Sequence, residues 1–197
     1  MARRGNTHRL SLRRDRRGAA AVELALVAFP FVMTLMAFME TGHYLFCLAA
    51  LDNGVQEAAR QIMTGQVQNA SQQLSAAQFR TSILCPLLPS TFNCNNVIVQ
   101  IQTFTESGSP GGFYSFVNAN QSGLNSPPLN NSQTSYCVGT GSAYVFVEVV
   151  YPMPLLTGAF AATATTFNGQ QVMLLTSGAA FRNEPFQAPG YKAPQGC

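Results

Sequence analysis

The sequence predicts an α+β protein in which one long N-terminal helix packs on a small antiparallel β-sheet. Two observations favour this fold class. An almost uncharged apolar stretch, Ala19–Met39, continues without a break into an amphipathic stretch that ends near Met63. Later segments rich in β-branched and aromatic residues, above all Val97–Thr105 and Ala143–Tyr151, have the composition of strands. The length of 197 residues accommodates one domain with appendages.

Charge is unevenly distributed along the chain. Only 10% of the residues are charged, well below the ~25% that is usual in soluble globular proteins. Residues 1–18 contain seven arginines and one aspartate, a net charge of +6, whereas residues 19–197 carry a net charge of −3. The basic character therefore belongs to a short N-terminal leader, and the composition argues against an ordinary cytosolic protein.

The stretch Ala19–Met39 is long enough to span a lipid bilayer. Its 21 residues contain one charge, and at ~1.5 Å per residue they extend about 31 Å as a helix, close to the ~30 Å hydrocarbon core. A secretory signal peptide would have a shorter apolar region followed by a small-residue cleavage site, which Glu40–Leu45 does not offer. We therefore expect a retained membrane helix, kinked at Pro30.

The arginines of the leader indicate the orientation of this helix. Seven precede the span, and the next Lys or Arg after it is Arg60. Because basic flanks stay in the cytoplasm, the C-terminal part is expected outside it. An arginine-rich arm that binds nucleic acid is the alternative, but the leader lacks interleaved aromatic residues and adjoins the span. We therefore expect the lipid bilayer as a partner, and no nucleic acid.

Glu23 is the one charged residue inside the apolar stretch. An ionisable side chain in a membrane span is costly and is by default a candidate functional residue. Near the membrane interface and the helix N-terminus, however, the helix dipole favours an anion. Position alone leaves both interpretations of Glu23 open.

A stripe of apolar residues predicts that the helix continues beyond the membrane to Met63. Thr64-Gly65 follows, and glycine is the preferred residue just past a helix end. The stripe is expected to pack against the domain that follows. Its members recur every three or four positions, at Tyr44, Leu48, Leu51, Val55, Ala59 and Ile62.

Strands dominate the expected structure of the C-terminal body. The best candidates are Val97–Thr105, Ala143–Tyr151 and Gln170–Phe181. Pro152 and Pro154 are expected to end the second strand, because proline cannot donate a ladder hydrogen bond. Three or four antiparallel strands would then pack against one helix face.

Less regular structure is expected elsewhere in the body. A short helix is predicted around Ser75–Leu84. Of the 37 residues in Glu106–Ser142, 22 are Gly, Ser, Asn or Pro. That composition predicts a long loop, with one short strand at Phe113–Val117.

Five cysteines suggest a disulfide-stapled body. Cys47, at the end of the span, is expected to be an inert apolar residue. The other four would lie outside the cytoplasm, where disulfides persist. Cys85 and Cys94 flank a short loop that a disulfide could close, with a stabilisation of about 2–3 kcal/mol. Cys137 and Cys197 would then pair by elimination.

The residue combinations that catalysis requires are missing. Of the two histidines, His8 lies in the leader and His43 follows the span. Residues 44–197 therefore contain no histidine for a Ser-His-Asp or Cys-His arrangement, and a His-rich metal site has too few ligands. The chain has no phosphate-binding glycine loop, no dinucleotide-binding glycine motif and no C-x-x-C. We expect no enzymatic activity, no cofactor and no metal.

Several of these segments together resemble a known family. Arg16–Leu26, a basic leader that ends in glycine and is followed by Ala-Ala-Ala-Val-Glu, looks like the start of TadE-like proteins, the pseudopilins of bacterial tight-adherence (Flp) pilus systems. It is also similar to type IV prepilins generally. Met39–Tyr44, Leu51–Arg60 and, near the C-terminus, Val147–Leu156 and Phe181–Phe186 continue the resemblance, as does the pairing of Cys85 with Cys94.

The resemblance implies a structural role in a pilus. A prepilin peptidase would cut between Gly18 and Ala19 on the cytoplasmic face, and Glu23 would pair with the freed α-amine of a neighbouring subunit. The fold would be pilin-like, with the apolar helix Ala19–Met39 packed among other such helices. Implied partners are the peptidase, other pilins or pseudopilins and the Tad secretion machinery. The protein would sit in the bacterial inner membrane as a single-pass protein with a periplasmic domain, or be incorporated in the pilus.

These expectations divide the chain into three parts: a cytoplasmic basic leader (1–18), a transmembrane and amphipathic helix (19–63), and an extracytoplasmic β-rich domain (64–197) with a long loop (106–142). The leading hypothesis is a minor pilin, pseudopilin or assembly factor of the pilus. The alternative is an uncleaved, membrane-anchored extracytoplasmic binding protein, with the long loop as its ligand loop.

Overall fold

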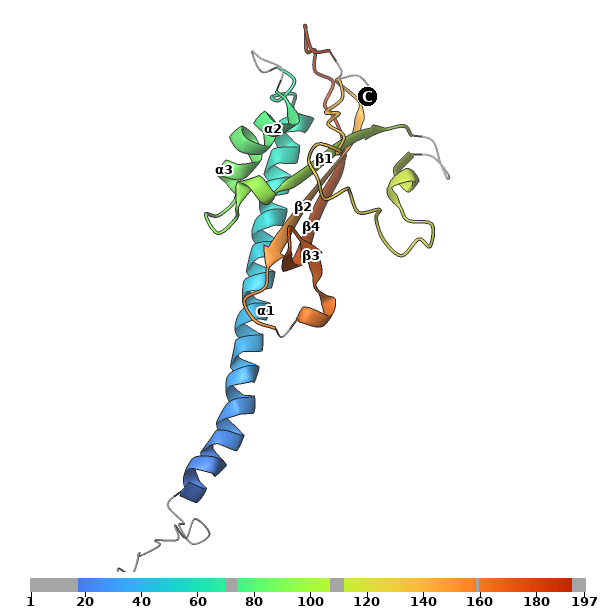
Figure 1. Cartoon of the computed structure of the whole chain (residues 1–197). Coiled ribbons are helices and arrows are strands. Elements are labelled where there is room, and N and C mark those ends of the chain that lie inside the picture. Colours follow the sequence, from blue (N-terminus) through green and yellow to red (C-terminus); the bar gives the residue numbers. More distant parts are fainter. Residues whose placement is uncertain (1–17, 70–73, 107–111, 159, 193–197) are drawn as a thin grey trace, which may run out of the picture.

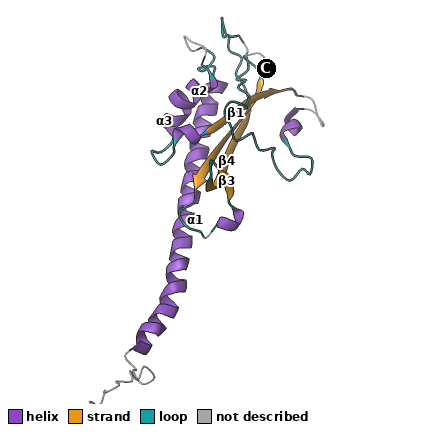
Figure 2. Ribbon diagram, in the orientation of Figure 1, coloured by secondary structure: helices purple, strands orange, loops and turns teal. Residues whose placement is uncertain are grey.

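A computed structural model describes residues 18–69, 74–106, 112–158 and 160–192. It confirms the predicted α+β class: a long N-terminal helix, α1 (Ala19–Met63), packs on a four-stranded antiparallel sheet. The sheet has the order β1-β2-β4-β3 (Figure 2). Its strands are β1 (Ile98–Phe104), β2 (Tyr144–Pro154), β3 (Thr165–Phe167) and β4 (Gln170–Arg182). The short helical elements are α2 (Ala76–Phe79), η2 (Arg80–Leu84), α3 (Cys85–Leu87), η3 (Cys94–Asn96), η4 (Gly112–Phe116) and η5 (Ala161–Thr163).

Helix α1 has the predicted bounds and two dissimilar halves. It runs unbroken through Pro30, and its first half extends away from the rest of the fold (Figure 1). From Glu40 onward one stripe is buried against the domain, which confirms the packing role expected for the amphipathic half. The buried residues of this stripe are Glu40, Cys47, Leu51, Gly54, Val55, Ala58, Ala59 and Ile62.

The helix ends where its sequence predicts, at a glycine in the left-handed conformation. Gly65 has φ +80°, its N–H donates to the carbonyl of Ile62, and the N–H of Gln66 donates to the carbonyl of Gln61. These two bonds satisfy the last carbonyls of α1 in the Schellman pattern. The ring of Phe186 lies so close that a Cβ on residue 65 would be 2.6 Å from it.

Replacing Gly65 by alanine should therefore destabilise the protein by about 2 kcal/mol, because backbone strain at positive φ adds to a clash inside a packed contact. Gly169→Ala is the matched control, since its φ is +79° but nothing lies within 4 Å of the added Cβ. That variant should lose about 1 kcal/mol from strain alone. Thermal unfolding of both variants in detergent measures the difference. Equal losses would show that Phe186 moves aside at no cost.

The sheet presents one face to α1. Alternate residues of β2, including Val145, Val147, Val149 and Met153, are buried in the same apolar cluster as the α1 stripe. Because side chains alternate along a strand, the intervening residues face the other side of the sheet. The core thus lies between α1 and one face of the sheet.

An aromatic cluster covers part of the opposite face, and it corrects one prediction. Residues 113–117, expected to form a short strand, instead lie mainly in the 3₁₀-helix η4. The rings of Phe113 and Phe116 are 5.5 and 4.7 Å from the ring of Phe146 on β2. Figure 1 shows this yellow segment on the side of the sheet away from α1. A helical turn places both rings on one side, toward the sheet, which an alternating strand would not do.

A second correction concerns the prolines of β2. Pro152 and Pro154 were expected to end the strand, but β2 continues through both and pairs them with Leu174 and Val172 of β4. Pairing with β1 stops at Val150, so beyond that residue β2 has a neighbour on one side only. Proline is tolerated at such an edge, because no ladder hydrogen bond is needed on the open side.

The outer edge of β1 is covered by the long loop. The side chain of Asn131 accepts a hydrogen bond from the Val99 N–H (3.1 Å) and donates one to the Val97 carbonyl (2.9 Å). Further along, the Cys137 N–H donates to the Ile101 carbonyl (2.9 Å). These bonds satisfy backbone groups that an open edge would leave available for unwanted pairing. Part of the long loop therefore packs along β1 as a component of the folded domain.

Glu148 is buried in the middle of β2. It is 2% exposed and lies between Gln100 of β1 and Gly178 of β4, on the face turned away from α1. Burial raises the pKa of this carboxyl to about 7. A neutral carboxyl is easier to bury than a carboxylate, so the fold favours the protonated form.

Candidate functional site

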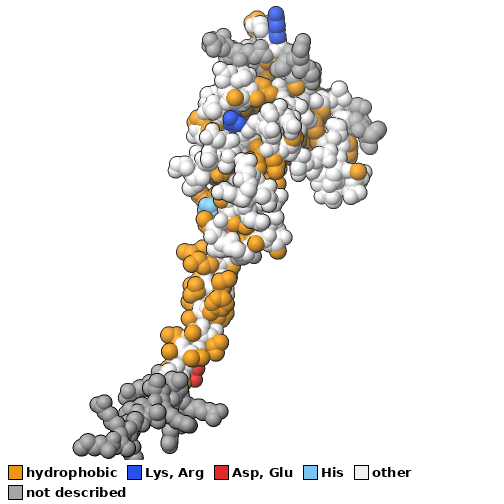
Figure 3. Space-filling model, in the orientation of Figure 1, with side chains coloured by type: hydrophobic (Ala, Val, Ile, Leu, Met, Phe, Trp, Pro, Cys, Tyr) orange, Lys and Arg blue, Asp and Glu red, His pale blue; other side chains and the backbone are white. Residues whose placement is uncertain are grey.

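The exposed half of α1 is the most unusual surface of the protein. In the described ranges, α1 is the one helix that is long and apolar enough to cross a membrane. The most apolar 18-residue window of α1 is entirely unburied. Figure 3 shows the apolar side chains around this half of the helix, below the body. The large ones are Val22, Leu24, Leu26, Val27, Phe29, Phe31, Val32, Met33, Leu35, Met36, Phe38 and Met39. A core helix of a soluble protein would bury such a surface, so this segment is a candidate membrane anchor.

The threonine hydroxyl within this half, and the one just past Glu40, need no hydrogen-bond partner from outside the helix. The hydroxyl of Thr34 donates to the carbonyl of Pro30 at 2.8 Å, and that of Thr41 donates to the carbonyl of Ala37 at 2.8 Å. Such bonds to the preceding turn let hydroxyl groups lie in an apolar environment, where an unmade hydrogen bond is costly. The segment is thus compatible with hydrocarbon surroundings except at Glu23.

Gly18, Ala19 and Glu23 lie together at the free end of α1. Gly18 is the residue before the first helical turn, and no side chain caps that turn. A Cβ on Gly18 would meet nothing within 4 Å. Glu23 is exposed and forms no ion pair with any residue that the structure describes. Within the described residues, neither the N-terminal turn of the helix nor the Glu23 carboxylate is engaged by another side chain.

Glu40 lies at the boundary between the two halves of α1, and sequence reasoning assigned it no role. It is 1% exposed. Its carboxylate accepts hydrogen bonds from the N–H groups of Leu156 (3.0 Å) and Thr157 (3.2 Å) and from the Thr157 hydroxyl. The sequence signal that could have found it is its place as the first charge after the apolar stretch. Glu40 connects α1 to the β2–β3 loop, residues 155–164.

A second polar contact joins α1 to the sheet further along. The Ser177 hydroxyl of β4 donates to the Asp52 carboxylate at 2.8 Å. Together with the apolar stripe, this bond and the Glu40 contacts hold the second half of α1 against the domain. The exposed half makes no such contacts with the rest of the described residues, and it projects as a continuation of the half that is held against the domain.

The four cysteines within the described ranges are either disulfide-bonded or buried. Cys85 and Cys94 form a disulfide with their Cα atoms 5.9 Å apart. Cys137 is also disulfide-bonded. Cys197 lies outside the described residues, so its pairing with Cys137 stays a prediction. Cys47 is a free, buried thiol, 3.6 Å from the Nε2 of His43.

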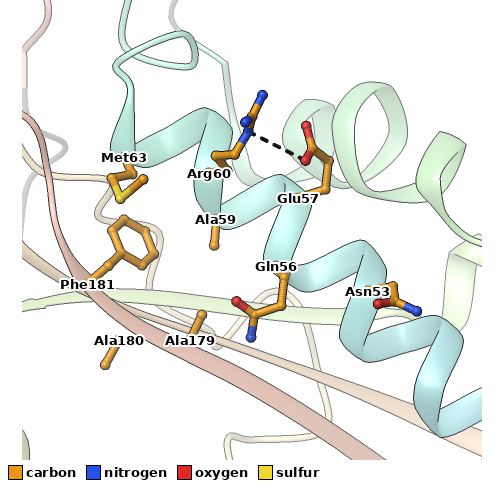
Figure 4. A pocket seen from close by; sticks show the side chains of 9 residues that line it. All are labelled: Asn53, Gln56, Glu57, Ala59, Arg60, Met63, Ala179, Ala180 and Phe181. Carbon is orange, nitrogen blue, oxygen red and sulfur yellow. Dashed lines mark ion pairs between the residues drawn. The ribbon is translucent and has the colours of Figure 1, made fainter.

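A groove between α1 and β4 is one of several hollows in the part of the chain that the structure describes. It measures about 430 Å³, and the ion pair between Glu57 and Arg60 (3.6 Å) lies on its helix side (Figure 4). The opposite wall is made of Ala179, Ala180 and Phe181. Its lining contains no histidine, cysteine, serine or tyrosine, and no three metal-ligating side chains gather anywhere in the described residues. The groove thus offers no nucleophile with an adjacent base.

Comparison with known proteins gives one match, and it covers the exposed half of α1 together with Glu40. Residues 18–60 match the family described as TadE-like protein, which confirms the resemblance inferred from the sequence over that segment. The match includes Gly18, Glu23 and Glu40. No curated protein and no solved structure matches the chain.

Proposed function

We propose that this chain, whose residues 18–60 are TadE-like and indicate a Tad pilus-associated protein, is a minor pilin, pseudopilin or assembly factor of a tight-adherence pilus. It acts structurally rather than as an enzyme. The observation that carries the proposal is the apolar half of α1, which projects unburied from a helix held firmly in the domain. Such a helix can lie in a bilayer and, equally, pack against like helices in an assembly.

In this proposal the protein crosses the inner membrane once. The arginine-rich leader stays in the cytoplasm and the sheet domain faces the periplasm. The disulfide between Cys85 and Cys94 is in keeping with that side, because disulfides persist outside the cytoplasm. The exposed surface of α1 is then solvated by lipid until other subunits replace the lipid.

Processing at Gly18-Ala19 would convert this membrane protein into an assembly subunit. A prepilin peptidase would remove the leader, which carries a charge of +6 and resists passage through the membrane. The new α-amine of Ala19 would add a positive charge to the positive end of the α1 dipole. The exposed Glu23 carboxylate of a neighbouring subunit is the group that could neutralise it.

The proposal is tested first by the intact mass and N-terminal sequence of the protein purified from the organism that encodes it. We expect a chain that begins at Ala19. Gly18→Leu should accumulate as the precursor, because the peptidase requires a small residue before the cut. Gly42→Leu is the matched control: it places the same side chain in open space on the same helix and should be processed normally. A mature chain that begins at Met1 or Ala2 would contradict processing and favour a permanently anchored binding protein.

A further inference from the structure

The β2–β3 loop lies at the level where α1 would leave the membrane. The apolar stretch ends at Met39, and the next residue, Glu40, holds the loop through Leu156 and Thr157. Figure 1 shows this orange loop beside α1 as the part of the sheet domain that reaches furthest toward the projecting half of the helix. Because 21 helical residues match the hydrocarbon thickness, a residue that directly follows them lies at the bilayer interface.

The composition of the loop suits that position. Residues 154–167 include no Asp, Glu, Lys, Arg or His. The side chain of Leu156 is 65% exposed, although the N–H of the same residue donates a hydrogen bond to the Glu40 carboxylate. Ala161 and Ala162 are exposed as well, and Phe160 is half-buried. A large apolar side chain exposed on an uncharged loop is costly in water but favourable among lipid acyl chains.

Glu40 explains how the loop is held there. A carboxylate near the hydrocarbon boundary is costly unless its oxygens are hydrogen-bonded. Two backbone N–H groups and one hydroxyl from the loop satisfy it. The same three bonds keep the loop against α1, so that its depth in the membrane is tied to that of the helix.

We propose that the described parts of the β2–β3 loop, residues 155–158 and 160–164, form a second membrane contact. This contact places Leu156 in the outer interface of the phospholipid bilayer crossed by α1, and Glu40 holds it in position. This inference depends on the membrane anchoring in the proposed function. The contact would limit pivoting of the domain about the point where α1 emerges. It would also have to be released, or exchanged for protein, when the subunit leaves the bilayer.

The chain contains no tryptophan, so single tryptophans can report the depth of chosen positions. Three sites of similar exposure are suitable: Leu156 (65%), Phe31 in the span (62%) and Tyr114 in η4 on the far side of the sheet (58%). Each full-length variant is reconstituted in phosphatidylcholine–phosphatidylglycerol vesicles with and without brominated acyl chains. We expect blue-shifted, quenched emission from Leu156→Trp and Phe31→Trp, and unquenched emission from Tyr114→Trp.

The outcomes separate this inference from the proposed function. Quenching of Phe31→Trp without quenching of Leu156→Trp would overturn the loop contact and leave the anchor intact. Loss of quenching at both positions would overturn the anchor and, with it, the loop contact. Combining Leu156→Trp with Glu40→Ala should reduce quenching of the tryptophan at position 156. Combining it with Thr157→Val, which removes only the hydroxyl donor, should reduce the quenching by less. Unchanged quenching in both double variants would overturn the holding role of Glu40.

Discussion

Replacing Glu23 by glutamine is expected to abolish assembly of the protein into the pilus while leaving its amount in the membrane unchanged. Glutamine keeps the size and polarity of the side chain but removes the charge. An α-amine at the positive end of α1 would then have no anionic partner in apolar surroundings, where an unpaired charge is strongly unfavourable. Removing the charge also makes the span more apolar, so membrane retention should not suffer.

The measurement is complementation of a deletion strain, with pili counted by electron microscopy and membrane protein quantified by immunoblot. Glu57→Gln is the matched control, because it makes the same chemical change on the same helix, at a half-exposed ion pair with Arg60. Such pairs contribute little, and that variant should assemble normally. Normal piliation by Glu23→Gln would refute the pairing role of Glu23 without affecting the membrane anchor.

Stability of the protein should fall as the pH rises from 5 to 8, because of Glu148. The carboxyl pKa is 4.5 for an ordinary glutamate and about 7 in the folded protein, where burial disfavours the charge. Between those values the folded protein holds a proton that the unfolded chain has released. Raising the pH therefore favours unfolding, and the loss is complete once the pH exceeds the folded pKa. Its upper limit is about 3 kcal/mol, at ~1.4 kcal/mol for each pKa unit.

Glu148→Gln should remove most of this dependence and should be more stable than the original protein at pH 8. Thermal unfolding in detergent at pH 5 and pH 8, followed by circular dichroism, gives the comparison. Glu184→Gln is the control, because that side chain is exposed and should leave the pH dependence in place. A Glu148→Gln protein that still loses the same stability between the two pH values would show that the dependence has another source.

Local patterns in the sequence were sufficient to predict the bounds of the long helix α1. Its start after Gly18, its course to Met63 and its end at Gly65 agree with the structure. Apolar periodicity and a glycine past the last turn act within a few residues of one another, so no knowledge of the rest of the chain is needed. Strands β1, β2 and β4 were predicted for the same reason, since β-branched and aromatic runs mark them directly, whereas the three-residue strand β3 was not predicted.

Contacts between distant segments explain the two predictions that were wrong, the strand at residues 113–117 and the end of β2 at its prolines. Phe113 and Phe116 form a helical turn because Phe146, on another element, offers an apolar surface. Pro152 and Pro154 remain in a strand because β1 has already ended on that side of the sheet. Neither circumstance is visible in the residues themselves, because sheet order and register are set by long-range packing.

Among the candidate functional residues, too, some were found from the sequence and others acquire their role only in the folded protein. Gly18, Ala19 and Glu23 are candidates from the sequence alone: Glu23 is the one charge inside the apolar stretch, and the cleavage role of Gly18 and Ala19 is implied by the family resemblance, so these roles stay predictions. Glu40 acquires its role from partners more than 100 residues away, and Glu148 from burial between two other strands. A carboxylate's hydrogen bonds and solvation depend on which backbone groups and side chains surround it in three dimensions. Only the folded chain brings those groups together.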